Sequence, residues 1–156
     1  MIVISHRGNL NGINPSMENR PDYIQKAIDD HFQVEIDLWY VDEGLYLGHD
    51  EPQYEIELDW LEQRKNDLWI HPKNFNALDF LTTSNLGYKY FWHNLDEYTV
   101  VSTKHIWAHN FDKLEKTDNC IVPLLDKKSL ILSFSTKFYG ICTDYATLCK
   151  QLLDEK

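Results

Sequence analysis

Short apolar segments that each end in a histidine recur along this chain, and they limit the folds that it can adopt. The first runs from Ile2 to His6, and later ones end in Ile70-His71, Trp92-His93-Asn94 and Ala108-His109-Asn110. Such runs are typical of short strands. In a (β/α) barrel the carboxyl ends of all strands meet at one rim, where active sites are built. The pattern therefore predicts a rim that several histidines share.

The order of the predicted elements favours an α/β fold. In the first half, strands expected at 2–6, 33–40, 45–47 and 68–70 alternate with helices expected at 18–30, 58–64 and 75–81, which is typical of parallel pairing. The second half shows strand patterns at 90–92, 105–107, 120–122 and 138–142, little room for helices between them, and a final helix at 145–152. Barrels of this class have about 250 residues, and this chain has 156. We therefore expect a contracted, irregular (β/α) TIM-type barrel with several outer helices missing, formed by residues 1–156 as a single domain.

Charge and hydropathy narrow the range of partners. The chain has 15 basic and 25 acidic residues, and its net charge of −10 repels nucleic acid. No apolar run approaches the ~20 residues that span a bilayer, and the amino terminus lacks the pattern of a signal peptide. Three cysteines without metal-ligand spacing fit reduced thiols. We expect a cytoplasmic protein that acts on a small molecule, with no nucleic-acid partner and no membrane span. Strands without covering helices would allow a homodimer.

Two carboxylates lie two residues apart in the predicted strand at 33–40. Side chains at such spacing point to the same face, about 7 Å apart by strand rise. Glu35 and Asp37 would therefore face the barrel interior, while the apolar residues between and around them pack outward. Burying both carboxylates without a partner would be costly, which favours a cation between them. The alternative is an amphipathic strand with a solvated acidic face.

The chain also has the groups that acid–base chemistry on a phosphodiester needs. His6 and His49 could exchange protons with the nucleophile and the leaving oxygen, because imidazole titrates near neutral pH. Arg7 could bind two phosphate oxygens at once. Taken singly, His6-Arg7-Gly8 could be a strand end before a glycine turn, and His49-Asp50 a capped turn with a surface histidine. Together with the carboxylate pair, these residues predict phosphodiester cleavage with a divalent cation.

Four motifs, in their order along the chain, resemble the glycerophosphodiester phosphodiesterase family. They are Ser-His-Arg-Gly-Asn (5–9), Pro-Ser-Met-Glu-Asn (15–19), Glu-Ile-Asp-Leu (35–38) and Gly-His-Asp (48–50), and the resemblance returns at Gly-Ile-Cys-Thr-Asp-Tyr (140–145). The middle of the chain matches poorly. The resemblance implies a barrel of the phospholipase C type that uses Mg²⁺ or Ca²⁺. It also implies that His6 and His49 are the acid–base pair, that Arg7 binds phosphate, and that Glu35 and Asp37 bind the cation with Glu18 beside them.

One position departs from the family pattern. The family places a third metal carboxylate two residues before a lysine on the next strand, whereas here His71 precedes Lys73. The lysine still suits a phosphate. An imidazole in place of a carboxylate weakens binding of Mg²⁺ and Ca²⁺ and favours Mn²⁺ or Zn²⁺. Alternatively, His71 packs without touching a metal. His93 and His109 match no family residue, and they are expected at the rim.

These features predict metal-dependent hydrolysis of a glycerophosphodiester, or of a related sugar or polyol phosphodiester, by a two-histidine mechanism. Two alternatives remain. One is a catalytically degenerate module that binds a phosphorylated ligand, which the missing carboxylate and the short barrel favour. The retained histidines and carboxylates count against it, because binding alone needs no acid–base pair. The other is a lyase that stops at a cyclic phosphate.

Overall fold

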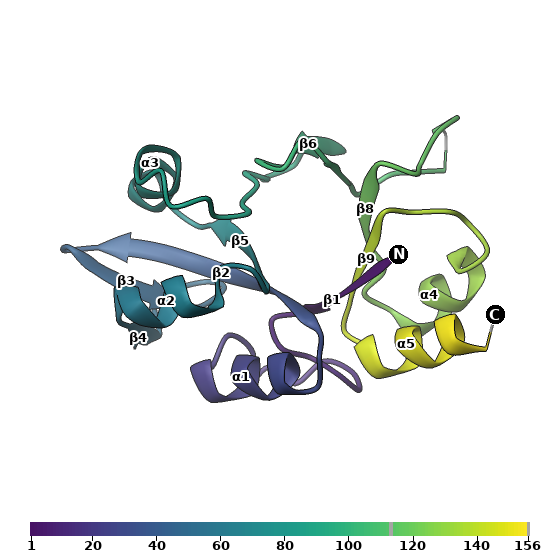
Figure 1. The fold of residues 1–156 in the computed structure, drawn as a ribbon, viewed down its shortest axis with the longest axis horizontal. Coiled ribbons are helices and arrows are strands. Elements are labelled where there is room, and N and C mark those ends of the chain that lie inside the picture. Colours follow the sequence, from purple (N-terminus) through teal and green to yellow (C-terminus); the bar gives the residue numbers. More distant parts are fainter. Residues whose placement is uncertain (113, 156) are drawn as a thin grey trace.

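In the computed structural model, which describes residues 1–112 and 114–155, one mixed sheet curls into a half-barrel with helices on its outside (Figure 1). The strands are β1 (Ile2–His6), β2 (Gln33–Val41), β3 (Gly44–Leu47), β4 (Tyr54–Ile56), β5 (Leu68–Pro72), β6 (Tyr98–Val100), β7 (Ile106–Ala108), β8 (Cys120–Pro123) and β9 (Gly140–Thr143). The helices are α1 (Pro21–Asp29), α2 (Leu58–Arg64), α3 (Phe75–Thr83), α4 (Lys127–Ser133) and α5 (Ala146–Asp154).

Parallel pairing organises the middle of the sheet. The strand order is β4-β3-β2-β1-β9-β8-β7-β6, and β5 pairs with β2. β1 is parallel to β2 and to β9, β5 is parallel to β2, and β8 is parallel to β7 and β9. The register places His6 opposite Glu35, and Asp37 opposite His71. The carboxyl ends of these strands therefore meet at one edge, and the predicted mixed α/β architecture is confirmed.

The wall between β5 and β6 is irregular. The predicted strand at 90–92 is present only as a single bridge between Tyr90 and Ile70. The carbonyl of Tyr90 accepts a hydrogen bond of 2.8 Å from the backbone N–H of Ser102, which follows β6. The segment around Tyr90 therefore connects β5 to the chain after β6. The strand pairs among the described residues do not form a complete ring, so the contracted barrel that we expected is a curled half-barrel.

Several elements differ from the sequence prediction. The helix expected from Glu18 begins at Pro21, because Asn19 has a positive φ of 61° that interrupts a helical path and proline suits the first helical turn. The strand expected to end at Ile70 continues to Pro72. α4, β4 and β6 were not predicted at all. The second half thus holds one more helix than we expected.

Two apolar layers hold the sheet. The outer layer has two parts. One packs α1, α2 and α3 against the outward side of β2 and β5, through Ile24, Ala27, Val34, Ile36, Leu38, Leu61, Leu68, Ile70 and Ala77. The other packs α4 and α5 against β8 and β9, through Val122, Leu130, Ile141 and Cys149. The inner layer fills the base of the half-barrel with Ile4, Trp69, Phe91, Val101, Trp107, Ile121 and Cys142. Because β2 gives its apolar residues to the outer layer, Glu35 and Asp37 face inward, as predicted.

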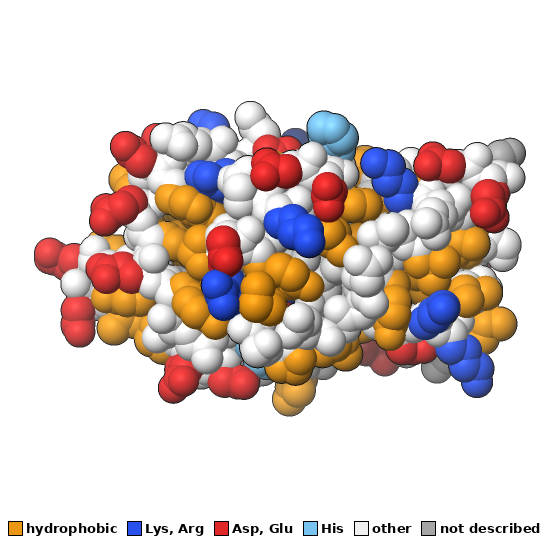
Figure 2. All heavy atoms as spheres, turned by 90° about the horizontal axis from the view of Figure 1, so that it is seen from below, with side chains coloured by type: hydrophobic (Ala, Val, Ile, Leu, Met, Phe, Trp, Pro, Cys, Tyr) orange, Lys and Arg blue, Asp and Glu red, His pale blue; other side chains and the backbone are white. Residues whose placement is uncertain are grey.

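Charged side chains are spread over the outside of the molecule. On the face seen from below, acidic side chains gather toward the end where β2 turns into β3, and apolar atoms lie between charges of both signs (Figure 2).

No helix formed by residues 1–112 or 114–155 is both long enough and apolar enough to cross a membrane.

Candidate active site

The inward face of the sheet has an apolar floor and a polar layer above it. Side chains two residues apart on an extended segment share a face, and five such segments each give an apolar residue to the floor and a polar residue to the layer above it. The pairs are Ile4 with His6, Trp69 with His71, Phe91 with His93, Trp107 with His109, and Cys142 with Asp144. Residues from distant parts of the sequence therefore meet above one floor.

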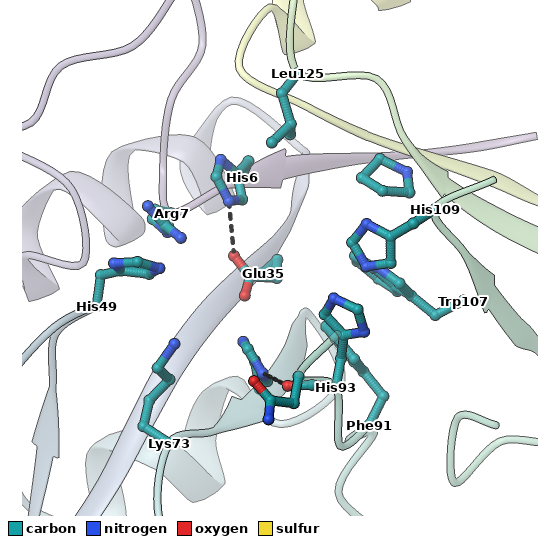
Figure 3. A pocket seen from close by; sticks show the side chains of 13 residues that line it. His6, Arg7, Glu35, His49, Lys73, Phe91, His93, Trp107, His109 and Leu125 are labelled. Carbon is teal, nitrogen blue, oxygen red and sulfur yellow. Dashed lines mark hydrogen bonds and ion pairs between the residues drawn. The ribbon is translucent and has the colours of Figure 1, made fainter. Parts of the chain in front are cut away.

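A cavity of about 380 Å³ lies in this polar layer. Figure 3 shows the side chains around it, with His6 and Arg7 on one side of Glu35, and His93, His109 and Trp107 on another. Among the predicted site residues, those that line the cavity are His6, Arg7, Glu35, His49, His71 and Lys73. Asp37 is buried with no exposed surface, and Glu18 does not line the cavity.

Glu35 is a buried carboxylate without a hydrogen-bond partner at one of its oxygens. Its side chain is 4% exposed, and Oε2 lies 3.9 Å from Nε2 of His6 with no hydrogen bond of its own. Burial raises the pKa of Glu35, and the negative charge of Asp37 raises it further. A carboxylate in this position needs a positive partner in the cavity.

Asp37 is surrounded by donors. Its Oδ2 accepts a hydrogen bond of 2.8 Å from Asn19 Nδ2 and lies 2.9 Å from Nε of Arg7, while Oδ1 lies 3.2 Å from Nδ1 of His71 and 3.4 Å from Nζ of Lys73. Burial alone would raise the pKa of Asp37. The hydrogen bond with His71 and the charges of Arg7 and Lys73 outweigh burial and hold this pKa well below its usual range. Asp37 therefore stays ionised.

Asn19 is a site residue to which we assigned no role from the sequence. Besides donating to the carboxylate of Asp37, its Oδ1 accepts a hydrogen bond of 3.0 Å from the backbone N–H of Asp37. This double contact fixes the middle of β2 to the loop before α1. Asn19 could have been predicted as a site residue from its position next to Glu18 in the second motif.

The side chain of Glu18 contacts neighbouring side chains and does not line the cavity. Its carboxylate accepts hydrogen bonds of 3.2 Å from Arg7 and 2.8 Å from Asn9. We placed Glu18 beside the metal ligands, whereas among the described residues it lies outside the group that could hold a metal. Its contacts orient the guanidinium of Arg7 instead.

His6 is oriented by a buried aspartate at the end of β9. Nδ1 of His6 lies 2.8 Å from Oδ1 of Asp144, and Asn9 Nδ2 donates to the same oxygen at 2.8 Å. Nε2 is left to point into the cavity. Burial lowers the pKa of His6, but the hydrogen bond to Asp144 and the charge of Glu35 more than offset it, so this pKa is raised. We did not identify Asp144 or Asn9 as site residues from the sequence, although both lie within the family-like motifs.

His49 lies at the mouth of the cavity, in the loop after β3. Its side chain is 43% exposed, and Nδ1 lies 2.7 Å from Oδ1 of Asp50, which is itself exposed. Gly48 precedes it with a φ of +152°, where an added Cβ would overlap the carbonyl oxygen of Glu51. The turn that delivers His49 to the cavity therefore depends on this glycine.

The remaining histidines form an aromatic wall. His71 stacks flat on Phe91, with 5.2 Å between ring centroids, and Phe91 stacks on Trp107 at 4.0 Å. His93 and His109 stack on each other at 3.8 Å. Burial lowers the pKa of both, and their mutual repulsion contributes for His109, whose pKa falls to about 4. His93 and His109 are therefore uncharged at neutral pH, and they lie opposite the cationic side formed by Arg7 and Lys73 (Figure 3).

One group of side chains could hold a divalent cation. Among the described residues, Glu35, Asp37 and His71 each offer a ligand atom, and these atoms lie within 4.8 Å of one another. Two carboxylates and one imidazole suit a cation such as Mn²⁺ or Zn²⁺. The residues present therefore fit a metal.

The chain shares its fold with a glycerophosphodiester phosphodiesterase. The crystal structure of that enzyme from Thermotoga maritima aligns with 97% of this chain and 98% of its own chain, at a TM-score of 0.53 and 16% sequence identity. No family model and no curated protein matches the sequence. The relation to the predicted family is thus shown at the level of the fold.

Proposed function

We propose that this chain hydrolyses a glycerophosphodiester, or a related sugar or polyol phosphodiester, with the help of a divalent cation. The observation that carries the proposal is that His6 and His49 line one cavity together with Glu35, a buried carboxylate with no hydrogen bond at Oε2. Each histidine has an aspartate at Nδ1, which leaves Nε2 for the substrate. A module that only binds phosphate would need Arg7 and Lys73 but no such pair.

The residues of the cavity divide the work between binding and proton transfer. Arg7 and Lys73 are placed to bind phosphoryl oxygens, since a guanidinium offers two parallel donors and an ammonium a compact charge. A hydroxyl or water attacks phosphorus after one imidazole removes its proton, and the other imidazole donates a proton to the leaving oxygen. Asp144 keeps a hydrogen on Nδ1 of His6, so the proton that moves is the one at Nε2.

A cation held by Glu35, Asp37 and His71 would stabilise negative charge on the phosphoryl group when it is bound. Without it, the unpartnered Oε2 of Glu35 would repel that charge. The fold shared with the glycerophosphodiester phosphodiesterase from Thermotoga maritima supports the proposed hydrolysis of a phosphodiester.

A screen of metals against substrates tests the proposal directly. Purified protein is freed of metal with a chelator and incubated with Mg²⁺, Ca²⁺, Mn²⁺ or Zn²⁺ and glycerophosphodiesters that differ in their alcohol, and the products are read by phosphorus NMR. We expect metal-dependent release of a phosphomonoester. A cyclic phosphate as the final product would favour a lyase, and binding without turnover under every condition would favour the degenerate binding module.

A further inference from the structure

The orientation of His71 determines which of its nitrogens can meet a metal. Nε2 lies 3.0 Å from the backbone carbonyl oxygen of His93. A carbonyl oxygen only accepts hydrogen bonds, so Nε2 carries the hydrogen of this contact. In the neutral ring, Nδ1 is then the nitrogen with the free electron pair. The stack on Phe91, with 8° between the ring planes, keeps the ring in this orientation.

The free electron pair of Nδ1 faces a carboxylate. Nδ1 lies 3.2 Å from Oδ1 of the buried Asp37. A hydrogen on Nδ1 would be donated to Oδ1, but while Nε2 alone carries the hydrogen, the electron pairs of Nδ1 and Oδ1 repel each other unless a cation accepts both. Ligand atoms bound to one ion at about 2.1 Å, with angles between 90° and 109°, lie about 3.0–3.4 Å apart. The observed separation therefore matches two neighbouring ligands of one ion.

The other contacts of the two carboxylates leave the right oxygens for that ion. Oδ2 of Asp37 is engaged by Asn19 and Arg7, so Oδ1, which lies beside His71, is the oxygen left for an ion. Lys73 lies 3.4 Å from Oδ1, and its single positive charge can neutralise only one of the two carboxylates, Glu35 and Asp37. Glu35 offers a carboxylate oxygen within 4.8 Å of the ligand atoms of Asp37 and His71. One nitrogen and two oxygens thus converge from β2 and β5.

We infer that His71 binds the cation through Nδ1, with its tautomer fixed by the His93 carbonyl, and that the site therefore selects a transition ion such as Mn²⁺ or Zn²⁺ over Mg²⁺ and Ca²⁺. Imidazole suits Zn²⁺ and other transition ions, whereas Mg²⁺ and Ca²⁺ prefer oxygen. A carbonyl that accepts from the second ring nitrogen is the usual support for a histidine ligand. The inference deepens the proposed function and rests on the cation site assumed there.

Metal binding without substrate tests this inference separately from catalysis. Chelator-treated wild-type protein is titrated calorimetrically with Mg²⁺, Ca²⁺, Mn²⁺ and Zn²⁺ in separate experiments. We expect Mn²⁺ and Zn²⁺ to bind at least ~10-fold more tightly than Mg²⁺, which corresponds to about 1.4 kcal/mol. Pulsed EPR of the Mn²⁺-loaded wild type should show a directly bound nitrogen, and this readout needs no substitution.

Variants at position 71 test whether His71 determines the preference of the site for transition ions. His71→Ala should lose at least ~10-fold in Zn²⁺ affinity, and His71→Glu should shift the preference toward Mg²⁺. His109→Ala is the matched control, because it removes another imidazole of the same cavity and should leave the affinities unchanged. Circular dichroism verifies that each variant is folded.

Two outcomes would overturn the inference: an Mn²⁺ complex without bound nitrogen, or a His71→Ala protein that binds Zn²⁺ as the wild type does. His71 would then be a protonated partner of Asp37. Hydrolysis supported by Mg²⁺ would in that case leave the proposed function standing. Conversely, nitrogen-ligated Mn²⁺ in a protein that cleaves no phosphodiester would leave the metal site standing and reject the proposed function.

Discussion

Nδ1 of His6 lies 2.8 Å from Oδ1 of Asp144, although the two residues are 138 positions apart in the chain. β1 and β9 are parallel neighbours, and both residues lie at the carboxyl ends of these strands. The aspartate is buried, and it accepts a second hydrogen bond from Asn9. Asp144 is therefore a positioning residue that fixes the tautomer and the direction of the His6 ring.

The substitution Asp144→Asn should impair His6 while leaving the cavity intact. The hydrogen bond to Asp144 raises the pKa of His6 against the effect of burial, so its loss should move the titration of His6 to lower pH. An amide can also stabilise the wrong tautomer, and we expect turnover to fall by at least ~10²-fold. Histidine NMR titration and the pH–rate profile measure both effects. An unchanged titration midpoint would show that Asp144 is only structural.

Removal of either cavity imidazole should abolish most of the turnover. His6→Ala and His49→Ala should each cost at least ~10²-fold in rate, the low end for lost acid–base catalysis. His31 provides the control, because it is exposed and does not line the cavity. His31→Asn is the suitable change there, since asparagine tolerates its positive φ of 66°. Parental rates in both cavity variants would rule out the two-histidine mechanism.

Local patterns predicted the parts of the fold that follow from short-range chemistry. The strand at Ile2–His6 and the helix at Leu58–Arg64 have the predicted bounds. The alternation along Gln33–Val41 also gave the correct direction for its carboxylates. In contrast, α4 was missed because its apolar residues follow no helical period: Leu130 is buried, whereas Ile131 and Leu132 beside it are exposed.

In the candidate site, too, some residues could be predicted from the sequence and others could not. Residues at strand ends were predicted to share a rim, because parallel strands bring their carboxyl ends together. The partners of those residues were not predicted. Nothing in the sequence near His6 indicates Asp144, and nothing near Asp37 indicates that Asn19 holds it by both its side chain and its backbone. Such pairs depend on tertiary contacts that short-range patterns do not contain.

Glu35 and Asp37 should respond in opposite directions to loss of their charge. In the absence of divalent cations, Glu35→Gln removes a buried charge without a partner, and the free energy of unfolding should rise by on the order of 1 kcal/mol. Asp37→Asn removes the anion of Lys73 and one of the two anions that Arg7 contacts, and it should cost about 3 kcal/mol. Urea unfolding in the presence of a chelator measures both. Changes of equal sign would contradict the charge distribution described for this site.

His109 should make the protein less stable at mildly acidic pH. Burial and the neighbouring imidazoles lower its pKa from 6.5 to about 4. Between these values the unfolded chain binds a proton that the folded chain does not, so stability is lost as the pH falls through this window. His109→Gln should therefore flatten the decline in unfolding free energy. His109 is exposed on one side, so solvent screens the effect and keeps it small. An identical pH dependence in His31→Asn and His109→Gln would contradict the prediction.

Gly48 should control catalysis through the placement of His49. At this position φ is +152°, and an added Cβ would overlap the backbone carbonyl of Glu51, so Gly48→Ala must displace the loop between β3 and β4. The backbone N–H of Gly48 also donates to the carbonyl of Asp37 at 3.2 Å, and the indole N–H of Trp39 donates to the carbonyl of Gly48 at 2.7 Å. These contacts connect the loop to β2, and the shift therefore moves His49 relative to the carboxylates.

We expect Gly48→Ala to lower the turnover number by at least ~10²-fold, close to the effect of His49→Ala. Metal affinity should stay near that of the wild type, because the proposed ligands belong to β2 and β5. Steady-state kinetics and calorimetry on the same preparation separate the two readouts. The double variant Gly48→Ala/His49→Ala should be no slower than His49→Ala alone, since both changes remove the same group from the cavity. Additive losses in the double variant would mean that Gly48 acts on the site by a route other than His49.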